Sequence, residues 1–143
     1  MSDRRTTRQP TPIAVGFAAS PAGEGVAYAR LLAPAPESLL RVAFTLKMQP
    51  ALRGRDVAYA ALRAVAAEVR ARGIARVEFH LDDEWLSVDL NERRTLPQAL
   101  VLPYVALRCE LNRLHDVSVV ADEAPVRDLA ARARAEVWLN VAA

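Results

Sequence analysis

The chain has 143 residues, of which 52% are hydrophobic and 25% charged, a size and composition typical of one compact domain with a real core. Its 19 basic and 17 acidic residues give a formal net charge of +2, which permits nucleic-acid binding but excludes a strong polyanion-binding field from total charge alone. A single cysteine excludes an internal disulfide framework, and no apolar run reaches the roughly 18 residues of a membrane span.

The first twelve residues are polar and show no periodicity. They carry Arg4, Arg5 and Arg8, and no apolar core of a signal peptide is present among them. We therefore expect a flexible basic tail over residues 1–12, solvated rather than bound to phosphates, and a cytoplasmic protein with no membrane partner. Residues 13–143 form a single predicted domain, because no internal repeat and no long linker divides them.

Three strands are predicted in succession after the tail. Residues 13–18 form a short apolar run that ends in a turn, and residues 25–32 and 39–48 are the next two candidates. In the third, Val42 and Phe44 alternate with polar or small residues, which is the period of a half-solvated strand. Three consecutive strands favour an antiparallel meander.

The hydrophobic period changes to that of a helix over residues 55–72. Ala58, Leu62, Val65 and Val69 recur at helical spacing, and Gly73 follows as a stop. Residues 76–81 then alternate again as a fourth strand. A strand, helix, strand order favours a parallel pairing with a right-handed crossover.

The remaining elements are a short helix over residues 84–90, a longer one over 97–114, and a short strand over 117–120. Pro125 opens a C-terminal helix that ends near Asn140. The element order predicts an α/β domain with a five-stranded mixed sheet, three antiparallel strands followed by parallel strands, flanked by helices.

Four segments support a more specific interpretation. Residues 16–20 resemble an Asp-Gly first hairpin, and residues 57–62 resemble an Ala-Glu-Tyr-x-Ala-Leu helix opening. Residues 81–86 resemble a Thr-Asp-Ser-x-x-Leu step, and residues 102–104 a Pro-Leu-Tyr helix. In this order and spacing, the chain resembles the bacterial ribonuclease H and reverse-transcriptase-like family over residues 13–139.

The resemblance implies catalysis by two divalent metal ions held by several carboxylates. At the corresponding positions, Ala18 replaces the first-strand aspartate and Ala58 replaces the first-helix glutamate, whereas Asp82 keeps the fourth-strand aspartate. Arg127 takes the place of the last acid. Its neighbour Asp128 is turned by about 100° on a helix, so an alignment shifted by one would restore a carboxylate there.

One aspartate with an uncertain second cannot hold two divalent ions, so we expect no catalytic residue and no cofactor. If a metal binds at all, the resemblance assigns it to Asp82 and Asp128. Arg127 facing Asp82 would neutralise it by an ion pair, a hypothesis that a structure can test. The favoured function is a catalytically inactive ribonuclease H-like domain that binds nucleic acid or assembles with a protein partner or a second copy.

The alternative is a divergent ribonuclease H that cleaves RNA in RNA–DNA hybrids with Mg²⁺ or Mn²⁺. Its rebuilt acidic site would use Asp82 and Asp128 with Asp122 or Glu123. A cleavage assay separates the two functions.

Arginines on or beside the first helix are the nearest feature to a basic patch. They would contact an RNA–DNA hybrid or RNA if the domain binds one, but a solvated helix face is the favoured explanation, because Asp56 and Glu68 dilute the positive charge. The residues assigned to nucleic-acid binding are Arg53, Arg55, Arg63 and Arg70.

Other conspicuous residues have simple structural explanations. For Trp85 and Trp138, core or interface packing is favoured over base stacking. Capping of the next helix explains the acids at residues 82–84 better than a cation site does. His80 and Cys109 are expected to be a structural histidine and a free thiol, because no catalytic partner is visible for either.

Overall fold

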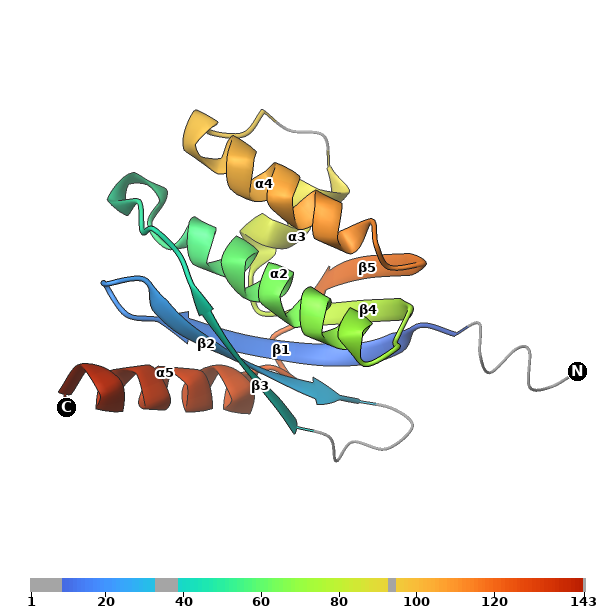
Figure 1. The fold of residues 1–143 in the computed structure, drawn as a ribbon, viewed down its shortest axis with the longest axis horizontal. Coiled ribbons are helices and arrows are strands. Elements are labelled where there is room, and N and C mark those ends of the chain that lie inside the picture. Colours follow the sequence, from blue (N-terminus) through green and yellow to red (C-terminus); the bar gives the residue numbers. More distant parts are fainter. Residues whose placement is uncertain (1–8, 33–38, 93–94, 143) are drawn as a thin grey trace, which may run out of the picture.

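The computed structural model describes residues 9–32, 39–92 and 95–142. Five strands form one sheet in the order β3-β2-β1-β4-β5. The strands are β1 (Thr11–Ala19), β2 (Glu24–Leu31), β3 (Leu39–Thr45), β4 (Arg76–Leu81) and β5 (Asp116–Ala121). The first three pair antiparallel, and β4 pairs parallel with both β1 and β5. This is the mixed sheet that the sequence predicts (Figure 1).

The element boundaries differ from the prediction at a few ends. Strand β1 begins at Thr11, so it takes in the last two residues assigned to the tail, while residues 1–8 lie outside the described residues. Residues 33–38, which include Pro34 and Pro36 between β2 and β3, also lie outside the described residues. Pro125 lies in a turn closed by a hydrogen bond from Val126 N to Glu123 O, so the last helix starts two residues after it.

Four α-helices and one short 3₁₀-helix complete the described part of the chain. They are η1 (Pro50–Leu52), α2 (Arg55–Ala71), α3 (Glu84–Asn91), α4 (Gln98–Leu111) and α5 (Arg127–Ala142). Each α-helix matches a predicted one, although α4 ends three residues early. None of these helices has the length and apolar character that a bilayer crossing requires.

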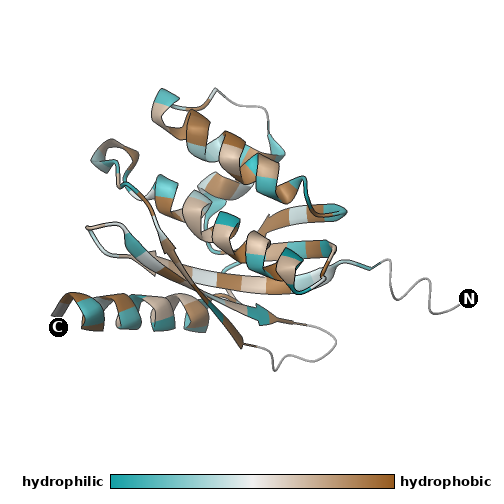
Figure 2. Ribbon diagram, viewed as in Figure 1, coloured by the Kyte–Doolittle hydropathy of each residue, from teal (hydrophilic) through white to brown (hydrophobic). Residues whose placement is uncertain are grey.

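The helices cover the two faces of the sheet unequally. Helices α2, α3 and α4 lie on one face, with α4 packed on α2, and α5 lies alone on the other (Figure 1). Strand β1 serves both sides, because Ile13 and Val15 join the larger core under α2 while Ala14 joins a smaller core under α5. Figure 2 shows hydrophobic residues along the central strands and also along α4.

Candidate functional site

The first candidate site lies where β4 ends beside β1. The parallel pairing of β1 with β4 ends at Val15 and Leu81, so Gly16 and Asp82 each directly follow the last paired residue of their strand. Ala18 is two residues further along β1, on the same side of the strand as Gly16. Along β1, Gly16 is therefore closer than Ala18 to the last pair with β4, and neither Gly16 nor Ala18 carries a carboxylate.

Helix α5 fills the space above this part of β1. A Cβ atom added at Gly16 would lie 2.2 Å from the backbone nitrogen of Ala130 and 2.5 Å from the carbonyl carbon of Leu129. Ala18 packs against the same small core under α5. No side chain at position 16 fits unless the helix moves, because backbone atoms cannot yield as a flexible side chain can.

The other positions implied by the resemblance also lack a convergent acid. Ala58 is buried in the core under α2, with 1% of its surface exposed. Arg127 pairs with Glu123 one helical turn away, at 3.1 Å between Nη2 and Oε1, so the hypothesis of an Arg127–Asp82 ion pair is wrong. Asp128 pairs with Arg30 of β2 at 2.9 Å, which directs its carboxylate toward β2.

A pair of divalent ions does not fit these residues. Asp82 is exposed and has no hydrogen-bond or ion-pair partner among the described residues, and Asp122 lies 3.3 Å from the His80 ring. Glu123 and Asp128 have cationic partners of their own. Across the described ranges, no three His, Cys, Asp or Glu side chains gather in a group that could hold a metal ion.

His80 has the structural role expected of it. Its Nε2 atom lies 2.7 Å from Glu78 Oε1 and its Nδ1 atom 3.3 Å from Asp122 Oδ2, so the ring links β4 to the residue that follows β5. Cys109 is an exposed free thiol on α4, and His115 lies in the turn after that helix.

The second candidate site lies where α2, α3 and α4 begin. A pocket of about 670 Å³ is lined there by Arg53, Arg55, Asp83, Trp85 and Gln98, among others. Asp83 caps α3, since its Oδ1 accepts a hydrogen bond from Leu86 N at 2.9 Å, which confirms the capping interpretation. Burial raises the pKa of Asp83, although backbone hydrogen bonds oppose this change.

A buried polar network holds one side of this pocket. Arg55 Nη2 and the Tyr59 hydroxyl both donate to Asp89 Oδ2, each at 2.7 Å. Asp89 is 5% exposed, and burial together with its hydrogen bond raises the pKa of Tyr59 far above the usual range. Arg55 and Tyr59 are four residues apart on α2, so helical spacing could have shown that they share a face, but nothing local identifies Asp89 as their partner.

The network positions an exposed aromatic ring. The Arg55 guanidinium carbon lies 4.6 Å from the centre of the Trp85 ring, and Trp85 is 58% exposed. Of the core or interface packing predicted for Trp85, core packing is wrong, because Leu86 and Leu90 form the buried side of α3. Core packing is also wrong for Trp138, which is 74% exposed one residue beyond the half-buried Val137, and interface packing stays a prediction for both rings.

The four arginines assigned to nucleic-acid binding fall into two groups. Arg55 pairs with Asp89, and Arg70 pairs with Glu110 at 3.2 Å. The side chains of Arg53 and Arg63 are exposed and have no ionic or hydrogen-bond partner within residues 9–32, 39–92 and 95–142. Arg53 lines the Trp85 pocket, where Gly54 starts α2 without a side-chain cap.

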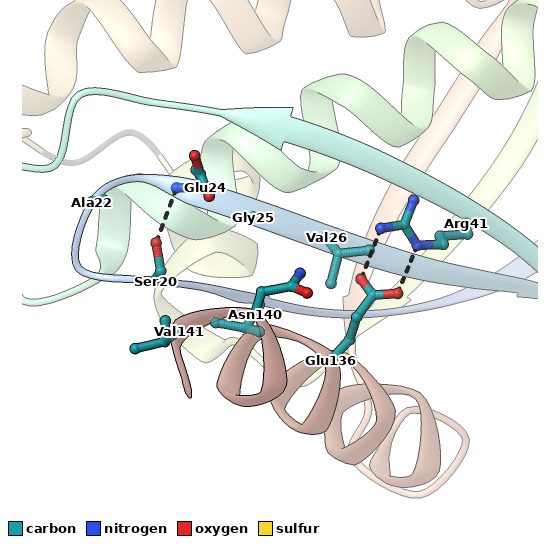
Figure 3. Close-up of a pocket in the computed structure, with 10 residues that line it drawn as sticks. Ser20, Ala22, Glu24, Gly25, Val26, Arg41, Glu136, Asn140 and Val141 are labelled. Carbon is teal, nitrogen blue, oxygen red and sulfur yellow. Dashed lines mark hydrogen bonds and ion pairs between the residues drawn. The ribbon is translucent and has the colours of Figure 1, made fainter. Parts of the chain in front are cut away.

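A further pocket, of about 250 Å³, lies between the β1–β2 hairpin and the end of α5 (Figure 3). Across it, Arg41 donates two hydrogen bonds to Glu136 at 2.7 and 2.9 Å, and the Tyr28 hydroxyl donates a third at 2.8 Å. The Arg41 guanidinium lowers the pKa of Glu136. These groups satisfy one another, so the arrangement fastens α5 to β2 and β3. No sequence motif pointed to it.

No family model matches the chain, and no curated protein matches its sequence. Solved structures do match its fold. The ribonuclease H1 of the halophilic archaeon Halobacterium salinarum NRC-1 is 16% identical, with a TM-score of 0.68, over 92% of this chain and 99% of that one. An N-terminal RNase H domain from Mycobacterium tuberculosis is 10% identical, with a TM-score of 0.63, over 85% and 95%.

LC11-RNase H1, solved in complex with an RNA/DNA hybrid, is 10% identical with a TM-score of 0.58, over 89% of this chain and 98% of that one. The TM-scores demonstrate a shared architecture. At identities this low, the chemistry has to be argued from the site. The chain has the ribonuclease H fold.

Proposed function

We propose that this protein is a non-catalytic ribonuclease H-fold domain that binds nucleic acid, an RNA–DNA hybrid or RNA, at the pocket where α2, α3 and α4 begin. The observation that carries the proposal is the exposed Trp85 ring, held by Arg55 beside the unpaired Arg53. A neighbour in the same fold, LC11-RNase H1, was solved with an RNA/DNA hybrid, which supports this class of ligand.

The pocket supplies both interactions that single strands and hybrid ends use. Arg53 offers a free cation to a phosphate, and Arg55 adds positive charge next to the ring. A base stacked on an aromatic side chain contributes about 1–3 kcal/mol, largely independent of sequence. We leave Arg63 and Arg70 out of this site, because Arg70 already has a carboxylate partner and neither lines this pocket.

The proposed lack of catalysis is supported by the small number of carboxylates at the end of β4. Asp82 alone cannot offset the dehydration of two divalent ions, and α5 occupies the space beside Gly16. We therefore expect no turnover with Mg²⁺ or Mn²⁺. The alternative, a divergent ribonuclease, would be identified by cleavage in the assay below.

The test is a cleavage assay and a binding assay on one labelled RNA–DNA hybrid. We expect no cleavage, and an affinity that falls as salt rises. Trp85→Ala and Arg53→Ala should weaken binding at least fivefold. The matched control is Arg134→Ala, an exposed arginine on α5 at the opposite face, which should bind as the parent does.

Two results would contradict the proposal. Turnover that disappears in Asp82→Ala would identify an active nuclease. Binding that Trp85→Ala and Arg53→Ala leave unchanged would place the nucleic-acid surface elsewhere.

A further inference from the structure

A second groove lies on the outer surface of the α2–α4 layer and shares no lining residue with the Trp85 pocket. It has a volume of about 340 Å³ and lies between α2, α4 and the segment that continues β3. Its apolar lining side chains are Leu46, Ala60, Leu102, Pro103 and Ala106.

Helix α4 is apolar on two sides, and only one of them is covered. Leu100, Leu107 and Leu111 are buried toward α2 and the core. Leu102 at the groove is 79% exposed, and Val105 is 48% exposed one turn further on. A helix that is apolar on both sides is typical of one that packs against a partner on its outer side.

The free charges around the groove have one sign. Lys47 and Arg63 line it, are exposed, and have no ionic partner in the described part of the chain. The acid of the groove, Asp56, is buried and accepts hydrogen bonds from Gln49 N at 3.0 Å and from Val57 N at 3.1 Å. A ligand in the groove would therefore contact apolar surface flanked by Lys47 and Arg63, which have no ionic partner among the described residues.

These features favour one kind of occupant. Two copies joined through α4 would bring their Lys47 and Arg63 side chains toward each other, which costs free energy through like-charge repulsion. A nucleic-acid backbone gains nothing from a leucine and proline floor, because that floor donates no hydrogen bond to phosphates. An amphipathic helix matches both parts of the groove, with its apolar side on the floor and its acidic side chains at the rim.

We propose that this groove docks an acidic amphipathic helix of a partner protein, with apolar anchors against Leu102 and Pro103 and carboxylates at Lys47 and Arg63. The proposal goes beyond nucleic-acid binding and does not depend on it. It assigns Arg63 to protein recognition instead of to the hybrid.

The probe is a synthetic helical peptide with leucines at positions i, i+3 and i+7 and glutamates at the exposed positions. One control peptide has the same composition in scrambled order, and another has lysine in place of glutamate. In a titration followed by amide chemical shifts of the full chain, the acidic amphipathic peptide should bind at least tenfold more tightly than either control. The shifts should concentrate at the groove residues of α2 and α4.

Three variants assign the interaction to the groove. Leu102→Ser should weaken binding at least tenfold without unfolding the domain, because Leu102 is largely exposed. The double change Lys47→Glu with Arg63→Glu should reverse the preference toward the lysine peptide. Val120→Ser, which alters an exposed apolar residue on β5, is the matched control and should bind as the parent does.

Several outcomes would overturn the proposal. One is the absence of groove shifts at millimolar peptide, and another is equal affinity for the three peptides. Self-association that Leu102→Ser abolishes would assign the groove to a second copy. A loss of hybrid binding in the double charge variant would assign it to nucleic acid.

Failure of this proposal and failure of nucleic-acid binding are distinguishable. Trp85→Ala and Arg53→Ala should abolish or weaken hybrid binding while leaving the peptide titration unchanged. Leu102→Ser should do the reverse.

Discussion

Two regions of the molecule are organised differently: small residues determine the packing where β4 ends beside β1, and a buried charge does so at the start of α2. At the strand ends, small residues allow the backbone of α5 to rest directly on Gly16, and Asp82 remains without a partner in the described ranges. At the start of α2, a buried aspartate fixes Arg55, which in turn lies over Trp85. The comparison teaches that a strand residue without a side chain lets a helix backbone lie directly on the sheet, whereas a buried carboxylate can fix two polar side chains at once.

The largest expected effect is on the packing of α5 against β1. Gly16→Asp would introduce a carboxylate on β1, but its side chain would collide with the backbone at Leu129 and Ala130. We expect the free energy of unfolding to fall by more than about 4 kcal/mol, from overpacking plus burial of a charge. Urea denaturation measures this loss. Ala22→Asp, at the exposed hairpin turn, is the control and should be nearly neutral.

A folded Gly16→Asp variant of parental stability would show that α5 can leave this part of β1. It would also reopen the possibility of a metal site there.

The next effect concerns the start of α2. Asp89→Ala removes the anion that holds Arg55 and Tyr59, and we expect a loss of about 3 kcal/mol, the lower end for a broken buried pair because Arg55 is 21% exposed. Hybrid affinity should fall with it, since Trp85 loses its support. If the unfolding midpoint and hybrid affinity stay unchanged, the network does not organise the pocket.

A smaller change separates capping from charge at the same pocket. Asp83→Ala should cost about 1 kcal/mol, because α3 loses the acceptor for Leu86 N. Asp83→Asn keeps that acceptor and removes a carboxylate whose pKa burial raises, so it should be neutral or slightly stabilising at pH 7. Equal destabilisation by both changes would mean that the charge, and not the cap, matters here.

The smallest effect returns to α5. Because Arg41 lowers the pKa of Glu136, this carboxylate stabilises the fold above its unfolded pKa of about 4.3, and the contribution is lost as pH falls through the lower folded value. Glu136→Gln should therefore be slightly less stable than the parent at pH 7. The difference should shrink as pH falls below about 4.3 and vanish only below the lower folded pKa of Glu136. Glu24→Gln, at the exposed start of β2, is the control for pH dependence.

Several features were predictable from the sequence because their causes are local. The periods of two and 3.6 residues identified β4 and α2, and Asp83 three residues before Leu86 indicated a cap. The strand and helix order was enough to predict the mixed sheet. Cytoplasmic location and the absence of a cofactor stay predictions.

Other features were decided only by the tertiary structure. The pairing of β1 with β4 ends one residue before Gly16 and Asp82, whereas motif alignment had selected Ala18, two residues further along β1. Arg127 faces Glu123, and Trp138 faces solvent, although both lie on a correctly predicted helix. Local periodicity determines that a helix forms, but a rotation of about 100° per residue decides which side chain meets the sheet, and only packing between distant segments sets that rotation.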